Sequence, residues 1–230
     1  MILHSIESTS LAIPFNGAFR HAAAQRSTTQ SVWVEAGSAD GLVGHGEGCP
    51  REYVTAESVS TAHAFIARHR QDWLESVHDL ETLDVWRSVH RTDVDANPAA
   101  WCAVELAILD LLGKQAARSV ESVLGLPELS GSFSYTAVIG DLAPDRFEAQ
   151  LAVYLAAGFR DFKVKLAGDP IRDGAKVRAM QRAGLDPARV RADANNLWPD
   201  AAAASRDLAS LEFPFGAVEE PIRAGDYEGL

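Results

Sequence analysis

The stretch "DFKVKL", residues 161–166, is predicted to be a buried β-strand that carries two lysines on one face. Residues at positions i and i+2 of a strand point to the same side of a sheet, so Lys163 and Lys165 are expected to lie side by side. Lysine is almost never buried without a partner, and like charges at this spacing repel each other. A purely structural strand would gain nothing from the pair, which therefore indicates a functional site.

A regular alternation of strands and helices surrounds this stretch. Strands are predicted at 135–140, 161–166, 189–196 and 216–221, and helices at 143–159, 169–184 and 199–211. Such an alternation predicts parallel βαβ units with right-handed crossovers. Two architectures fit it, a doubly wound sheet or part of a (β/α) barrel. No G-x-G-x-x-G motif follows the first strand, which weakens the dinucleotide-binding interpretation.

The first part of the chain has a different pattern and is predicted to be an α+β domain. Hydrophobic periodicity predicts two strands and two helices, at 4–13, 31–36, 55–69 and 99–115. The first helix is expected to be capped by Thr55. The turn-rich segment 125–131 ends this part, so the predicted domains are 1–128 and a partial (β/α) barrel, strands 1 to 4, over 129–230.

The composition favours a soluble cytoplasmic protein. Of 230 residues, 47% are hydrophobic, but no apolar run is long enough to span a membrane, and the N-terminus does not resemble a signal peptide. The two cysteines, Cys49 and Cys102, lie far apart and are expected to be reduced. The net charge of −11 repels phosphate backbones, so we expect no nucleic-acid partner. An anionic substrate would need cations placed locally.

Polar and charged residues occur near the C-terminal ends of three successive predicted strands: Lys163 and Lys165, Asp193 and Asn195, Glu219 and Glu220. A single charge at a strand end is commonly a helix cap or a solvated loop residue. In a barrel, however, these ends face one mouth, where Asp193 and Glu219 would converge. Two carboxylates with an amide nearby favour a hard cation, for which we expect Mg²⁺. Zinc is disfavoured because all seven histidines lie at or before His90.

The lysine pair suits a proton-transfer role. Each ammonium makes the other harder to protonate, and a nearby divalent cation would act in the same direction. A neutral lysine amine is a usable general base. We therefore expect abstraction of a proton alpha to a carboxylate, with the metal holding that carboxylate and stabilising the enolate that forms.

Three tripeptides stand in order on successive predicted strands: KVK at 163–165, DAN at 193–195 and EEP at 219–221. With the segments 44–58 and 103–114, they resemble the enolase superfamily, and more closely its mandelate racemase and muconate-lactonizing branches, over essentially the whole chain. The resemblance implies an α/β fold, in which an N-terminal α+β capping domain precedes the first half of a (β/α)7β TIM-like barrel.

The resemblance also implies roles for individual residues. Asp193 and Glu219 are expected to be ligands of Mg²⁺, and Lys165 to be the acid/base on one face of the substrate. Lys163 would tune Lys165 or touch the substrate carboxylate, and Asn195 would support the site.

The segment 14–27 is similar to the capping-domain loop that closes over the substrate in this superfamily. Arg20, His21 and Arg26 would then contact the distal end of a small carboxylate substrate, although flexible surface charges would give the same pattern. The full-length form is expected to be a homo-oligomer that binds no membrane.

The chain departs from the superfamily pattern at its end, because it stops at Leu230, soon after the fourth predicted barrel strand. A complete member would carry a third acidic ligand on the fifth strand and an opposing acid/base beyond it. We therefore expect a C-terminally truncated chain, or one whose missing part is supplied elsewhere, with little or no activity alone.

For the full-length enzyme the pattern favours a racemase or epimerase of an amino-acid derivative. The alternatives within the superfamily are an o-succinylbenzoate synthase, a cycloisomerase and a sugar-acid dehydratase. A catalytically incomplete fragment or binding protein is an alternative of another class. A flavodoxin-like or nucleotide-binding protein is disfavoured because no glycine-rich phosphate loop opens a helix.

Overall fold

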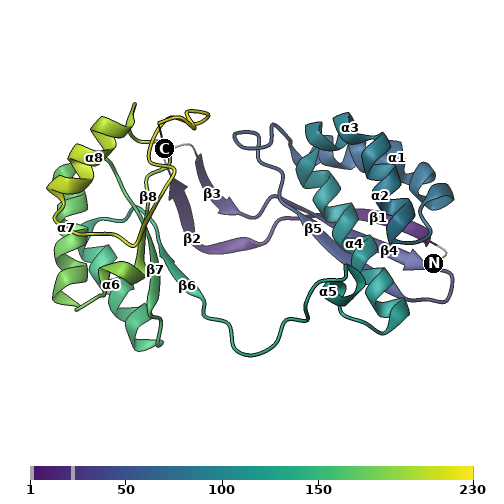
Figure 1. Cartoon of the computed structure of the whole chain (residues 1–230), viewed down its shortest axis with the longest axis horizontal. Helices are drawn as coiled ribbons and strands as arrows, with labels where there is room; N and C mark the ends of the chain where they lie inside the picture. The colour runs from purple at the N-terminus through teal and green to yellow at the C-terminus, as the bar shows by residue number, and fades with distance from the viewer. Residues whose placement is uncertain (1–2, 22–23, 230) are drawn as a thin grey trace. The chain divides into compact units, whose positions relative to one another are not determined.

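The computed structural model describes residues 3–21 and 24–229, and the side chains of residues 16–26 lie outside that description. The chain forms two compact units, Met1–Gly17 with Ser27–Gly131 and Ala18–Arg26 with Ser132–Leu230. Figure 1 shows the helices and strands of both. The domain boundary expected after residue 128 stays a prediction.

The first unit is an antiparallel sheet packed against helices. Its three strands have the order β1-β4-β5 and are Leu3–Leu11, Ser31–Ser38 and Val43–Gly48. Its helices are α1 (Val59–Ser76), α2 (Leu80–Val89), α3 (Arg91–Ala96), α4 (Pro98–Ala116) and α5 (Val120–Val123). Strands β2 (Pro14–His21) and β3 (Ala24–Thr28) pair with each other. This arrangement confirms the predicted α+β organisation.

Helix α4 lies unusually close to strand β5. Gly44, Gly46 and Gly48 occupy alternate positions of the strand, on the face that α4 contacts. A Cβ atom added at Gly44 would stand 2.1 Å from the carbonyl oxygen of Ala107, so a side chain there would push the helix away. The N-terminus of α4 is held from the other side by the buried carboxylate of Glu57.

The predicted start of the first helix was wrong. Helix α1 begins at Val59, and its cap is Ser58, whose hydroxyl accepts the backbone N–H of Thr61. Thr55 instead accepts the backbone N–H of Arg51 through its hydroxyl, within the preceding turn. The chain between Thr55 and Ser58 passes through a left-handed residue at position 56, which is incompatible with a helix that starts at Thr55.

The second unit is a four-stranded parallel sheet with helices between its strands. The strands have the order β6-β7-β8-β9 and are Thr136–Ile139, Asp161–Lys165, Val190–Asp193 and Ala217–Glu219. The helices are α6 (Pro144–Ala156), α7 (Pro170–Arg182) and α8 (Ala201–Ser210), with the short 3-10 helix Pro187–Arg189 before β8. Strand order follows sequence order, as in a barrel, and the α/β fold predicted from the alternation is confirmed.

The two faces of this sheet differ in chemistry. Phe162 and Val164 of β7 are buried in a core that includes Phe147 of α6 and Val177 of α7. Figure 1 shows α6 and α7 beside these strands. Side chains alternate along a strand, so Lys163 and Lys165 point to the opposite face. The apolar face thus anchors the helices, and the other face is left for the charged residues.

Within residues 3–21 and 24–229, no helix combines the length and the apolar character that a membrane crossing requires. Cys49 and Cys102 are both free thiols at exposed positions.

Candidate active site

Three strands of the second unit end at the same level, and each ends on a charged residue. Lys165 ends β7, Asp193 ends β8 and Glu219 ends β9. The register pairs Lys165 with Asp193 and Asp193 with Glu219. Because neighbours in a parallel register present side chains to the same face, the three side chains lie in one row across the sheet.

The charged groups in this row are in direct contact. The ammonium of Lys165 donates to Oδ2 of Asp193 at 2.6 Å and to Oδ1 of Asn195 at 2.7 Å. The ammonium of Lys163 lies 2.8 Å from the same Asp193 oxygen and 2.7 Å from Oε1 of Glu219. Two ammonium groups therefore share one carboxylate oxygen. The Asp193 side chain is 1% exposed, whereas that of Glu219 is 36% exposed.

The contacts set the protonation of the cluster. Burial works to raise the pKa of Asp193, but hydrogen bonds from Lys163 and Lys165 outweigh it, so the pKa lies below its usual value. Burial works to lower the pKa of Lys163, but the hydrogen bonds to Asp193 and Glu219 outweigh it, so the pKa is raised. For Lys163 this contradicts the expectation that the neighbouring lysine makes its amine harder to protonate. Two carboxylates surround that ammonium, and their attraction exceeds the repulsion from Lys165.

Asn195 links two parts of the site. Its side-chain nitrogen donates to Glu220 at 3.1 Å while its oxygen accepts from Lys165, and its backbone N–H donates to Oδ1 of Asp193 at 3.2 Å. Asn195 and Glu220 both have a φ of 46°. Asparagine tolerates this left-handed conformation, but for glutamate it is a strained one. The backbone just after the strand ends is therefore held in a shape that the surrounding contacts must stabilise.

A second cluster of charges, which sequence reasoning missed, lies beneath the end of β7. The Lys176 side chain is 1% exposed, and its ammonium has three acceptors. These are Asp141 at 2.8 Å, Asp173 at 2.9 Å and the backbone carbonyl of Lys165 at 2.8 Å. An ammonium has three N–H donors, so the hydrogen-bonding capacity of Lys176 is filled. Lys176 thereby fixes the backbone of the residue whose side chain reaches Asp193.

Asp173 extends this second cluster to the loop after β7. Its carboxylate accepts the backbone N–H groups of Ala167 and Gly168, each at 2.9 Å. One signal for the cluster was present in the sequence. Positions 173, 176, 177 and 180 share one face of a helix, and that face also carries the core residues Val177 and Met180. Two opposite charges on an apolar helix face indicate a buried pair.

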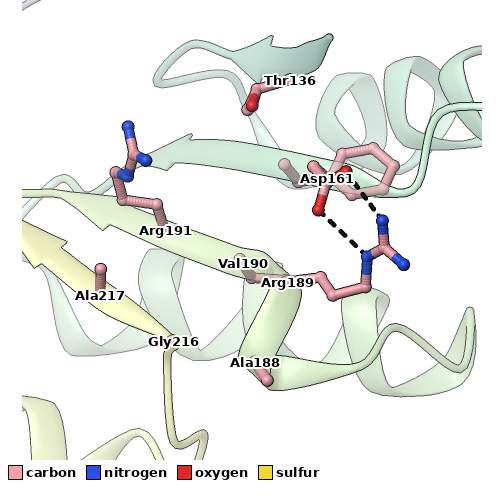
Figure 2. Close-up of a pocket in the computed structure, with 9 residues that line it drawn as sticks. Thr136, Asp161, Ala188, Arg189, Val190, Arg191, Gly216 and Ala217 are labelled. Carbon is pink, nitrogen blue, oxygen red and sulfur yellow. Dashed lines mark hydrogen bonds and ion pairs between the residues drawn. The ribbon is translucent and has the colours of Figure 1, made fainter. Parts of the chain in front are cut away.

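Figure 2 shows a hollow of about 270 Å³ at the other end of the same sheet. Its lining includes residues at the starts of the strands, among them Thr136, Asp161, Val190 and Ala217. The guanidinium of Arg189 donates to both oxygens of Asp161, at 3.0 and 2.8 Å. The hollow lies mainly at the N-terminal ends of the strands, but Arg191, which also lines it, lies 3.8 Å from Oε2 of Glu219. Residues at that end of a barrel serve stability rather than catalysis.

The structure leaves one group of predicted residues unplaced. Arg20 and His21 belong to β2 and Arg26 to β3, but their side chains lie outside the described residues. Their expected contact with the substrate stays a prediction. So do the roles expected for Lys163, Lys165, Asp193, Glu219 and Asn195, although the structure brings these five side chains together.

Two family profiles match the chain. "Mandelate racemase / muconate lactonizing enzyme, N-terminal domain" matches residues 6–125, and "Enolase C-terminal domain-like" matches residues 146–230. Together they cover both units, which confirms the resemblance found in the tripeptides.

Individual proteins similar to the chain are named as epimerases or racemases. The chain is 30% identical to the L-Lys-D/L-Arg epimerase of Methylococcus capsulatus over 97% of its own length and 61% of the relative's. It is 25% identical to the N-succinyl-L-Arg/Lys racemase of Bacillus cereus, over 100% of its own length and 62% of the relative's. A crystal structure of the dipeptide epimerase from Methylococcus capsulatus, complexed with Mg and the dipeptide L-Arg-D-Lys, superposes with a TM-score of 0.86. It has 29% identity and covers 100% of this chain and 64% of that one. The chain thus spans about three fifths of the length of these relatives.

Proposed function

The chain belongs to the mandelate racemase / muconate lactonizing enzyme family, and from this premise we propose that the protein abstracts a proton alpha to a carboxylate, as a racemase or epimerase of an amino-acid derivative. The observation that carries the proposal is the row of charges at the strand ends. Lys163 and Lys165 meet Asp193 and Glu219 there at 2.6–2.8 Å.

In this proposal Lys165 is the base. The Cα–H bond of the substrate breaks, its electron pair enters the enolate, and the proton goes to the neutral amine at Nζ of Lys165. Return of that proton, or delivery of another from the opposite face, completes exchange or inversion. Lys163, which lies between Asp193 and Glu219, keeps a second positive charge beside the base. Asn195, which accepts from Lys165 at 2.7 Å, orients the amine.

The residues present fit a divalent cation. The ammonium of Lys163 lies between Asp193 and Glu219, within 2.8 Å of both, which supports a cation site shared by the two carboxylates. Carboxylate oxygens are the donors that Mg²⁺ prefers. Asp193 and Glu219 would hold it, and it would supply positive charge against the substrate carboxylate and the developing enolate. Lys163 and Lys165 would then give up these carboxylates.

The proposed substrates are dipeptides or N-acylated amino acids. Two observations support this class: the similar Methylococcus epimerase and Bacillus racemase both carry such substrates in their names, and the Methylococcus structure was solved with a dipeptide. Both substrate types have a carboxylate next to the carbon that would lose its proton. The α-amino group of that residue is acylated in both, so it adds no positive charge beside the ammonium groups of Lys163 and Lys165.

The test measures exchange of the substrate α-hydrogen with D₂O by NMR, using the full-length gene product with Mg²⁺. The probes are L-Arg-L-Lys and N-succinyl-L-lysine. We expect wild-type exchange with at least one of them, and a loss of about 10²–10⁴-fold in Lys165→Ala. Lys114→Ala is the matched control, because Lys114 belongs to α4 of the first unit and pairs there with Asp110.

Two outcomes would count against the proposal in different ways. Unchanged exchange in a folded Lys165→Ala variant would exclude Lys165 as the base. Absence of exchange by the wild type with both probes would exclude the substrate class.

A further inference from the structure

A group of potential metal ligands lies in the first unit, where neither the proposed reaction nor the family resemblance places one. His69 and Asp72 stand one turn apart on α1, and His90 stands at the junction of α2 and α3. We propose that His69, Asp72 and His90 bind a divalent transition-metal cation of the Zn²⁺ class. The inference is independent of the proposed function, since it uses residues of the first unit alone.

The donor atoms are close to the spacing that such a cation requires. One ligand atom from each residue lies within 4.8 Å of the other two. Bonds to zinc are about 2.0–2.1 Å long and tetrahedrally arranged, so ligand atoms stand about 3.3–3.4 Å apart. The widest pair in the group must therefore close by up to about 1.5 Å. The Asp72 side chain is 46% exposed, so its rotation can supply part of that movement.

Each histidine already has the second partner that metal-binding histidines usually have. Nε2 of His69 lies 3.1 Å from a carboxylate oxygen of Asp93, to which it donates. Nδ1 of His90 lies 3.0 Å from the backbone carbonyl of Trp86, which can only accept, so that nitrogen carries the proton. These contacts leave Nδ1 of His69 and Nε2 of His90 as the nitrogens that a cation could contact. Ligating histidines are oriented in this way, through a carboxylate or a carbonyl on the other nitrogen.

His90 and Asp72 face each other across a short gap. Nε2 of His90 lies 3.6 Å from Oδ2 of Asp72. A cation bound between the two residues would contact both atoms. Burial lowers the pKa of His69, although the hydrogen bond that its imidazole donates to Asp93 works to raise it. Neutral imidazole is the form that binds metals.

The surroundings protect the group from one side. Trp86 stacks on the imidazole of His90 with ring centroids 4.1 Å apart, and its indole N–H donates to Oδ2 of Asp72 at 2.5 Å. A carboxylate oxygen has more than one lone pair, so Oδ2 of Asp72 can accept this N–H and still contact a cation. Two nitrogens and one oxygen suit Zn²⁺, Ni²⁺ or Cu²⁺, whereas Mg²⁺ prefers oxygen donors alone. The two carboxylates at the strand ends and this group are thus expected to select different metals.

The test uses protein without a polyhistidine tag and titrates it with Zn²⁺ in the presence of excess Mg²⁺. Calorimetry should show one Zn²⁺ site per chain that Mg²⁺ does not displace, and Co²⁺ should give a visible absorption band. Trp86 reports on binding through tryptophan fluorescence, because it contacts both His90 and Asp72.

Variants separate a ligand role from a structural one. We expect Asp93→Asn to weaken Zn²⁺ binding by about 10–100-fold, as losses of outer partners do, and His90→Gln and Asp72→Asn to weaken it further. His78→Gln is the control, because this exposed histidine lies in the turn between α1 and α2 and should leave binding unchanged.

Circular dichroism shows whether each variant is folded, and Asp72→Asn serves if His90→Gln is not. The proposal is wrong if the wild type binds no Zn²⁺. It is equally wrong if folded Asp72→Asn binds as tightly as the His78→Gln control. A fluorescence change with pH but not with Zn²⁺ would show that a proton alone fills the gap between His90 and Asp72.

Discussion

The second unit contains two lysine–carboxylate clusters, and they differ in how their charges are matched. The ammonium of Lys176 is 1% exposed and has three acceptors for three donors, so its cluster is closed. The ammonium groups of Lys163 and Lys165 share one oxygen of Asp193, and their second carboxylate, Glu219, is 36% exposed. The closed cluster holds the backbone around it in one conformation. In the open cluster, whose partners are shared and partly exposed, a carboxylate can exchange its ammonium partner for another cation, and an ammonium can exchange its carboxylate partner for a substrate.

The largest effect on stability is expected when the closed cluster is broken. Lys176→Met should lower the free energy of unfolding by about 3–5 kcal/mol, because it leaves Asp173 and the carbonyl of Lys165 buried without their cation. Urea denaturation followed by circular dichroism measures the change. A loss below about 1 kcal/mol would mean that the cluster contributes no more than a surface pair does.

A smaller loss of stability is expected in the open cluster. Lys165→Met should cost about 1–2 kcal/mol, close to the worth of one charged hydrogen bond, because Asp193 keeps Lys163 as a partner. The same denaturation experiment, run beside Lys176→Met, tests the comparison directly. Equal losses in the two variants would remove the distinction between a closed and an open cluster.

Magnesium should distinguish the clusters without any mutation. The chain has four lysines, at positions 114, 163, 165 and 176, so ¹⁵N-lysine labelling gives few side-chain signals. If Asp193 and Glu219 bind Mg²⁺, the signals of Lys163 and Lys165 should move on titration, because these ammonium groups lose their carboxylates. The signals of Lys176 and Lys114 should stay. The Asp193→Asn variant should abolish the response, and a response confined to Lys176 would place the metal elsewhere.

The sequence was sufficient to predict the four strands of the second unit and the convergence of charges at one end, but not β2, β3 and β5. Periodicity located "DFKVKL", and a parallel sheet places all C-terminal strand ends at one edge. The residue that caps helix α1 could not be predicted from the sequence pattern. Thr55 and Ser58 are both good capping residues, and only the path of the backbone decides between them.

Two features depended on contacts between distant residues. The raised pKa of Lys163 comes from Asp193 and Glu219, which the register of neighbouring strands brings to it. The sequence argument counted the neighbouring Lys165 and a nearby divalent cation, but not these carboxylates. Lys176 was missed because a lysine three residues after an aspartate on a helix normally forms a solvated pair. Its burial depends on Asp141, which belongs to another loop.

The smallest effect is expected at the opposite end of the sheet, where Arg189 pairs with Asp161 at the surface. The hydrogen bond from Arg189 lowers the pKa of Asp161 below the usual 3.8. A carboxyl group whose pKa is depressed by folding stabilises the protein above its unfolded pKa, and this contribution is lost as the pH falls through the folded value. Arg189 is exposed and Asp161 is partly exposed, so Arg189→Gln should change the urea midpoint at pH 7 too little to separate it from the wild type. Any difference should vanish at high salt, which screens the pair, or as the pH falls through the lowered pKa of Asp161. A loss at pH 7 that matches Lys176→Met would show that burial does not decide which of these ion pairs stabilise the sheet.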